Sequence, residues 1–163
     1  MRLMISMLIL FLLAECVSGC RTANLHFAKG MGCWETTTTL PDSPFRTHSV
    51  GIKIYTKGGY FPRPPRQDQL ALVERVRKSL PTLLPLIVQK LGEYDKTLKD
   101  KKTLRDQLFN PSICLFDSED EPNNAWSFAV ERPDTVGDPS VGDGLVYFVK
   151  FNEMEIVDVY AGD

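Results

Sequence analysis

The sequence predicts an α+β fold in which an antiparallel β-meander packs on a kinked helical hairpin. Two short segments with strand-like patterns come first, a long stretch with helical spacing of apolar residues follows, and four further strand-like segments come last. The chain has 163 residues, of which 43% are hydrophobic and 25% charged, and this is the size and composition of one globular domain.

Two strands are expected before the helical stretch. Residues 33–40 contain four consecutive threonines, which are β-branched and prefer an extended backbone. In residues 50–55 apolar residues alternate with other residues, which is the period of a half-buried strand.

The middle of the chain predicts helices. Residues 67–94 place apolar side chains three and four residues apart, with charged residues between them. Pro81 and Pro85 fall inside this stretch, and a proline in a helix interior costs about 3 kcal/mol because it removes a hydrogen bond and clashes with the preceding turn. We therefore expect a helix over residues 67–79, a break or kink, and a second helix ending near residue 94. Residues 95–108 predict a short further helix.

The C-terminal part of the chain predicts a meander of four strands. These strands are expected at residues 113–116, 126–130, 145–151 and 154–160. The third strand is apolar on both faces apart from Lys150, which indicates a central strand covered on both sides. A two-residue turn at Asn152 and Glu153 places Val149 opposite Ile156 in the last hairpin.

The N-terminal residues have the organisation of an export signal. Arg2 precedes an apolar run over residues 3–14, which is too short to span a bilayer as a helix. The sequence Val-Ser-Gly-Cys follows and ends at Cys20. It resembles the lipobox of bacterial lipoproteins, in which small residues precede an obligatory cysteine.

The lipobox resemblance implies that Cys20 receives a diacylglycerol, becomes the new amino terminus and anchors the protein to a membrane of the bacterial cell envelope. It divides the chain into a signal peptide (1–19), a tether (20–32) and a single α+β domain (33–163). Arg21 after the cysteine implies the outer membrane in bacteria that have one. Two alternatives are an ordinary signal peptide, which leaves a soluble secreted protein, and an uncleaved anchor.

Two cysteines, Cys33 and Cys114, remain in the expected mature chain. An oxidising compartment favours one disulfide between them, and two separate buried thiols are the alternative. The formal net charge of −2 leaves no basic stripe for a phosphate backbone, so we expect no nucleic-acid partner.

Motifs for catalysis and metal binding are scarce. The chain has two histidines, and no His-x-x-x-His, Cys-x-x-Cys, Gly-x-Ser-x-Gly or phosphate-loop pattern occurs in it. Cys33 and His48 can be drawn as a nucleophile and its base, but such pairs are common by chance. The acidic run of residues 117–124 lacks the order of a calcium loop and is expected to be a solvated turn. We therefore expect no catalytic residue, no metal and no cofactor.

Two segments carry the candidate binding residues. Tyr60 and Phe61 lie in a proline-rich connector, where core packing explains aromatic residues least. Asp138 and Asp143 lie in the long connection of residues 133–144, and loops of this length often bind ligands.

Three C-terminal segments, AWSFAVER (125–132), GLVYFVKF (144–151) and VDVYAGD (157–163), resemble the strand meander of small uncharacterised bacterial α+β domains. Some of those domains are immunity or immunity-like proteins that bind a toxin, so the resemblance favours binding over catalysis. We expect a lipid-anchored, non-catalytic binding domain whose partner is an envelope protein or a toxin. The alternative is an envelope enzyme that uses carboxylates as acid and base.

Overall fold

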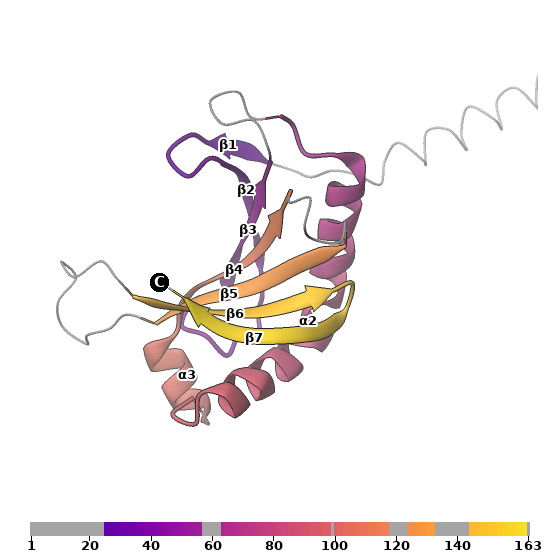
Figure 1. Cartoon of the computed structure of the whole chain (residues 1–163). Coiled ribbons are helices and arrows are strands. Elements are labelled where there is room, and N and C mark those ends of the chain that lie inside the picture. Colours follow the sequence, from indigo (N-terminus) through magenta and orange to yellow (C-terminus); the bar gives the residue numbers. More distant parts are fainter. Residues whose placement is uncertain (1–24, 57–62, 99, 118–123, 133–143, 163) are drawn as a thin grey trace, which may run out of the picture.

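The computed structural model of the chain describes residues 25–56, 63–98, 100–117, 124–132 and 144–162. Seven strands form one twisted sheet in which their spatial order is their order along the chain. Two helices accompany this sheet (Figure 1). The fold class is therefore α+β, as predicted.

The sheet is mostly antiparallel. Its strands are β1 (His26–Ala28), β2 (Cys33–Thr39), β3 (Ser49–Tyr55), β4 (Phe109–Phe116), β5 (Ala125–Arg132), β6 (Leu145–Asn152) and β7 (Glu155–Gly162). Only the β3–β4 pair is parallel within the described strands. The helices α2 (Gln67–Tyr94) and α3 (Lys101–Gln107) connect β3 to β4, and a parallel pair requires a crossover of this kind.

The helix α2 is continuous where the sequence predicts two helices. Pro81 and Pro85 lie inside it, and the helix changes direction along its length without ending (Figure 1). Leucines on both sides of the prolines, such as Leu80 and Leu91, are buried in the same core. This shared burial offsets the cost of the missing hydrogen bonds, so of the two expected alternatives the break is absent and the kink is present. The short helix predicted within residues 95–108 is present as α3.

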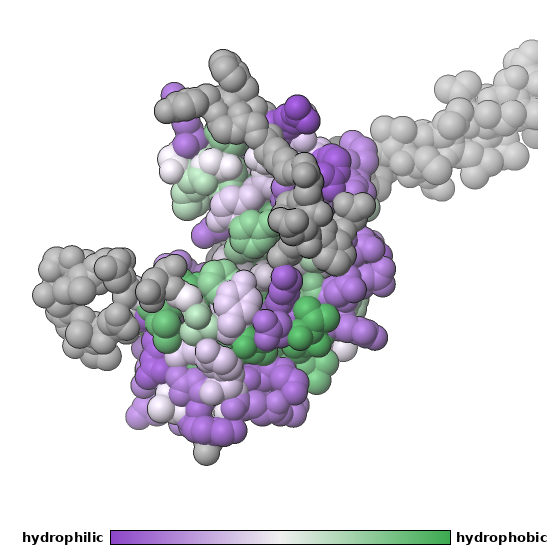
Figure 2. Space-filling view, in the orientation of Figure 1, coloured by the Kyte–Doolittle hydropathy of each residue, from purple (hydrophilic) through white to green (hydrophobic). Residues whose placement is uncertain are grey.

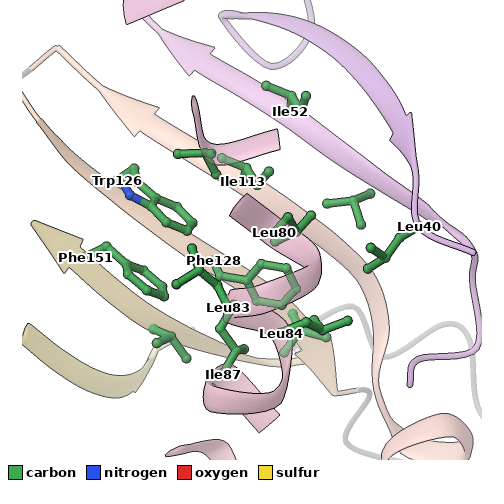
Figure 3. Close-up of a cluster of buried hydrophobic side chains, with 14 of the residues drawn as sticks. Leu40, Ile52, Leu80, Leu83, Leu84, Ile87, Ile113, Trp126, Phe128 and Phe151 are labelled. Atoms are coloured by element: carbon green, nitrogen blue, oxygen red, sulfur yellow. The ribbon is translucent and has the colours of Figure 1, made fainter. Parts of the chain in front are cut away.

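The core lies between α2 and one face of the sheet (Figure 3). Leu80 and Ile87 from the helix meet Ile113 and Phe128 from the central strands, and all four side chains are buried. Trp126 stacks on Phe151 with 4.0 Å between ring centroids. Trp126, Phe128 and Phe151 are therefore core residues on the face of the sheet that packs against α2.

The last hairpin is shifted from its predicted register. Val149 lies opposite Val159 and not Ile156. The turn falls one residue later than expected, with Glu153 at a φ of 54°, and Val157 is an extra residue that bulges from β7. A positive φ at a glutamate is uncommon, so the residue types around the turn gave no signal for this register.

The strand β6 is buried on one face only. Tyr147, Val149 and Phe151 point to the core and are buried, whereas Val146 and Phe148 on the other face are partly exposed. The expectation of a strand covered on both sides is therefore wrong, because α2 packs on one face of the sheet.

The strand β1 falls within the segment predicted as a tether. Phe27 of β1 pairs with Trp34 of β2, and their ring centroids are 5.6 Å apart. The sheet therefore starts before residue 33, where the domain was expected to begin.

Candidate functional site

Most of the site residues predicted from sequence fall outside the described part of the chain. They are Cys20, Tyr60, Phe61, Asp138 and Asp143. Their roles stay predictions. Of the acidic run, Asp117 is described, and its carboxylate accepts a hydrogen bond from Arg66 just before α2.

Cys33 and Cys114 are buried and unbridged. Cys33 of β2 pairs with Tyr55, and Cys114 of β4 pairs with Lys53, so β3 lies between the two cysteines. Two strand spacings amount to about 10 Å, whereas a disulfide needs Cα atoms within about 7 Å. The expected disulfide is not formed, and the chain holds two separate buried thiols.

Cys33 and His48 lie at opposite ends of one hairpin. Cys33 is the first residue of β2. His48 lies beyond the other end of that strand, and the His48 carbonyl accepts a hydrogen bond from Leu40 N–H. Six residues of strand separate the two ends, which is about 20 Å. Burial raises the pKa of the Cys33 thiol and also that of Cys114, which disfavours the reactive thiolate. These residues do not form a nucleophile–base pair.

The structure contains a groove with a volume of about 690 Å³. It lies between the loop that joins β2 to β3, the second half of α2, and α3. Its apolar lining consists of Leu40, Pro41, Pro44, Pro81, Leu84, Pro85 and Val88. Its polar lining consists of Asp42, Ser43, His48, Lys101 and Arg105. Mostly apolar walls with a few polar groups, at this volume, are typical of ligand sites.

The loop wall of this groove is held in place by Phe45. The Phe45 ring is buried and stacks on Phe128 of β5, with 5.6 Å between centroids. Within the loop, Ser43 N–H donates to the Leu40 carbonyl, and Phe45 N–H donates to Ser43 Oγ. The wall is therefore fixed before any ligand arrives, which lowers the entropic cost of binding.

The α2 wall is an apolar stripe formed by Pro81, Leu84, Pro85 and Val88. Their spacing of three and four residues puts them on one side of the helix. Pro81 and Pro85 are exposed, unlike the leucine between them. Because proline has no N–H, the carbonyls of Arg77 and Pro81 lack their helical donors. The wall thus presents two exposed proline rings beside the buried Leu84.

The α3 wall contributes two cations, Lys101 and Arg105. They are four residues apart and so lie on one side of α3. Asp100 caps the helix by accepting a hydrogen bond from Thr103 N–H at 2.8 Å, and Leu104 is buried beneath it. Within the described residues, neither Lys101 nor Arg105 has an ion-pair partner. The α3 wall therefore offers a ligand two cations that no described carboxylate neutralises.

Sequence reasoning missed this groove. The prolines at positions 81 and 85 were interpreted only as helix breakers, although two exposed prolines one turn apart are also a flat apolar surface. Lys101 and Arg105 looked like ordinary solvated charges. The three walls are distant in sequence, and only the crossover between β3 and β4 brings them together.

The face of the sheet that points away from α2 is a weaker candidate. Its centre is lined by small residues such as Ser112 and Ser127, which are buried. Its aromatic residues are paired with each other, since Tyr55 stacks on Phe116 and Phe148 stacks on Tyr160. Apolar and polar side chains are mixed over β4–β7 in the space-filling view (Figure 2). These rings already have partners, whereas the two cations of the groove have no ion-pair partner among the described residues.

The described residues contain neither a metal site nor a membrane-spanning helix. In the described part of the chain no group of three or more histidine, cysteine, aspartate or glutamate residues is placed to hold a metal ion. The described helices include none with the length and apolar character needed to cross a membrane. Comparison of the chain with protein-family models, with curated proteins and with solved structures finds no match.

Proposed function

We propose that the chain is a lipid-anchored, non-catalytic binding protein of the bacterial envelope. The groove between the β2–β3 loop, α2 and α3 binds part of a partner protein, either an envelope protein or a toxin. One observation carries this proposal: the groove is concave, apolar and prearranged, and its two cations, Lys101 and Arg105, have no ion-pair partner among the described residues.

Two sequence features support the proposed lipid anchor and the proposed binding role. The pattern that ends at Cys20 resembles a lipobox, and acylation at that cysteine holds a protein on a membrane stably when two or more chains are attached. The C-terminal segments resemble small uncharacterised bacterial α+β domains, some of which are immunity-like proteins that bind a toxin.

The test is photo-cross-linking in living bacteria with the full chain. p-Benzoylphenylalanine replaces Pro85, which lines the groove, or Lys78, which is exposed on α2 outside it. Cells are fed a radiolabelled fatty acid and irradiated, and their membrane and soluble fractions are then separated. We expect acylated chain in the membrane and a discrete adduct from position 85 that is missing from position 78. In a Cys20→Ser background the acyl label should disappear and the signal should stay uncleaved.

Two results would contradict the proposal in different ways. An unacylated wild-type chain in the soluble fraction means that the lipid anchor is wrong and the protein is secreted. Identical adducts from positions 85 and 78, or none from either, mean that the groove is not a binding site.

A further inference from the structure

We infer that the segment bound in the groove is an acidic peptide with apolar side chains, so that its carboxylates pair with Lys101 and Arg105 while its apolar groups pack on the α2 wall. This inference rests on the proposed function and adds the chemistry of the partner.

The charge of the groove points to carboxylates. Its lining contains two permanent cations, Lys101 and Arg105, and one carboxylate, Asp42. The two cations come from one side of α3 and outnumber the single carboxylate, which comes from the β2–β3 loop, so the lining carries a net positive charge. A lysine attracts carboxylates as a point charge, and an arginine binds them in a bidentate manner. Two acidic residues in one segment satisfy both side chains.

The apolar wall points to a peptide. Pro81 and Pro85 present flat, exposed rings on which leucine, phenylalanine or proline side chains can pack. One peptide segment can carry two carboxylates for the two cations, whereas a fatty acid carries one. A peptide therefore matches both cations and the apolar rings together.

The experiment is a selection from random decapeptides displayed on phage. The target is the purified full chain in a neutral maltoside detergent, compared with the double variant Lys101→Glu/Arg105→Glu. A matched control, Lys78→Glu/Lys102→Glu, makes the same change of charge at exposed positions outside the groove. Thermal unfolding of all three proteins checks that they are folded. Enriched peptides are sequenced, and their affinities are measured.

We expect peptides from wild type and from the control to be rich in aspartate, glutamate and apolar residues. Peptides selected on the groove variant should carry lysine and arginine instead. Peptides selected on wild type should bind the groove variant about tenfold more weakly or worse, since a charge-assisted pair is lost and replaced by repulsion.

Several outcomes overturn the inference. The groove variant selects the same acidic peptides as wild type, or no peptide is enriched on wild type. Sodium dodecanoate, tested in parallel, saturates the groove with one molecule per chain although no peptide binds, which indicates an amphiphile site. If cross-linking from position 85 still finds a partner in any of these cases, the proposed function stands and only the acidic chemistry is wrong.

Discussion

Asp95, the residue that ends α2, connects this helix to the sheet through its carboxylate. One oxygen accepts hydrogen bonds from Tyr147 of β6 at 2.6 Å and from Arg132 of β5 at 2.7 Å. The other accepts from the backbone N–H and the hydroxyl of Thr97. Burial by itself raises the pKa of Asp95, but these hydrogen bonds and the charge of Arg132 outweigh it and lower that pKa to about 2. The ionised form is therefore the one that stabilises the fold.

Replacement of Asp95 by asparagine should lower the free energy of unfolding at pH 7 by about 2 kcal/mol. The folded-state pKa lies below the unfolded value of 3.8, so this stability is present above pH 4 and is lost as the pH falls towards 2. Urea unfolding at pH 7 and at pH 2.5 measures the difference. Asp106→Asn, at an exposed position on α3, should behave like wild type at both. An equal deficit of Asp95→Asn at the two pH values would show that packing and not ionisation is responsible.

Among the elements, α2 contains two prolines that lower its stability and that its packing against the sheet does not require. Its buried leucines need only the helical period, whereas Pro81 and Pro85 are exposed and each removes a backbone hydrogen bond. Both prolines line the groove. Residues that lower stability are expected where they serve binding, and the two prolines fit this expectation.

The variant Pro85→Ala should therefore be more stable and bind more weakly. Alanine restores the N–H that can donate to the Pro81 carbonyl, and the gain of about 3 kcal/mol is reduced by about 1 kcal/mol because the unfolded chain becomes freer. We expect the free energy of unfolding to rise by about 2 kcal/mol in urea titrations, while the affinity for groove-selected peptides falls. Pro41→Ala, in the loop wall, has no helical bond to regain and should not be stabilised. A Pro85→Ala protein with unchanged affinity would show that the proline ring is not part of the binding surface.

How far the sequence predicts these elements depends on how local their determinants are. The strands β2 and β3 and the helix α3 follow from patterns of a few residues, so they were predicted. The parallel pairing of β3 with β4 depends on a crossover of two helices, which no local pattern encodes. The register of β6 and β7 depends on the positive φ of Glu153. The groove depends on three distant segments, and its residues therefore looked ordinary one at a time.

At the scale of the whole molecule, the first strand of the sheet and the groove lie at opposite ends. The strand β1 and the helix α3 stand far apart along the molecule, and α3 lines the groove (Figure 1). His26 is already part of β1. Only six peptide units separate it from Cys20, and they span about 20 Å at most when fully extended. If Cys20 is acylated, as we propose, the short connection places the β1 end close to the bilayer and the groove on the side of the envelope space.

This arrangement predicts an order of distances from the membrane. A fluorescent amino acid replaces either Lys29, in the turn after β1, or Lys102 on α3, and both positions are exposed. The acylated full chain is reconstituted into vesicles that carry a nitroxide quencher on the lipid headgroups. Because quenching requires close approach, we expect strong quenching at position 29 and weak quenching at position 102. Iodide in the aqueous phase should quench both labels to a similar extent, which confirms that the two sites are equally accessible. The reverse order would place the groove against the bilayer, where a partner protein has no access to it.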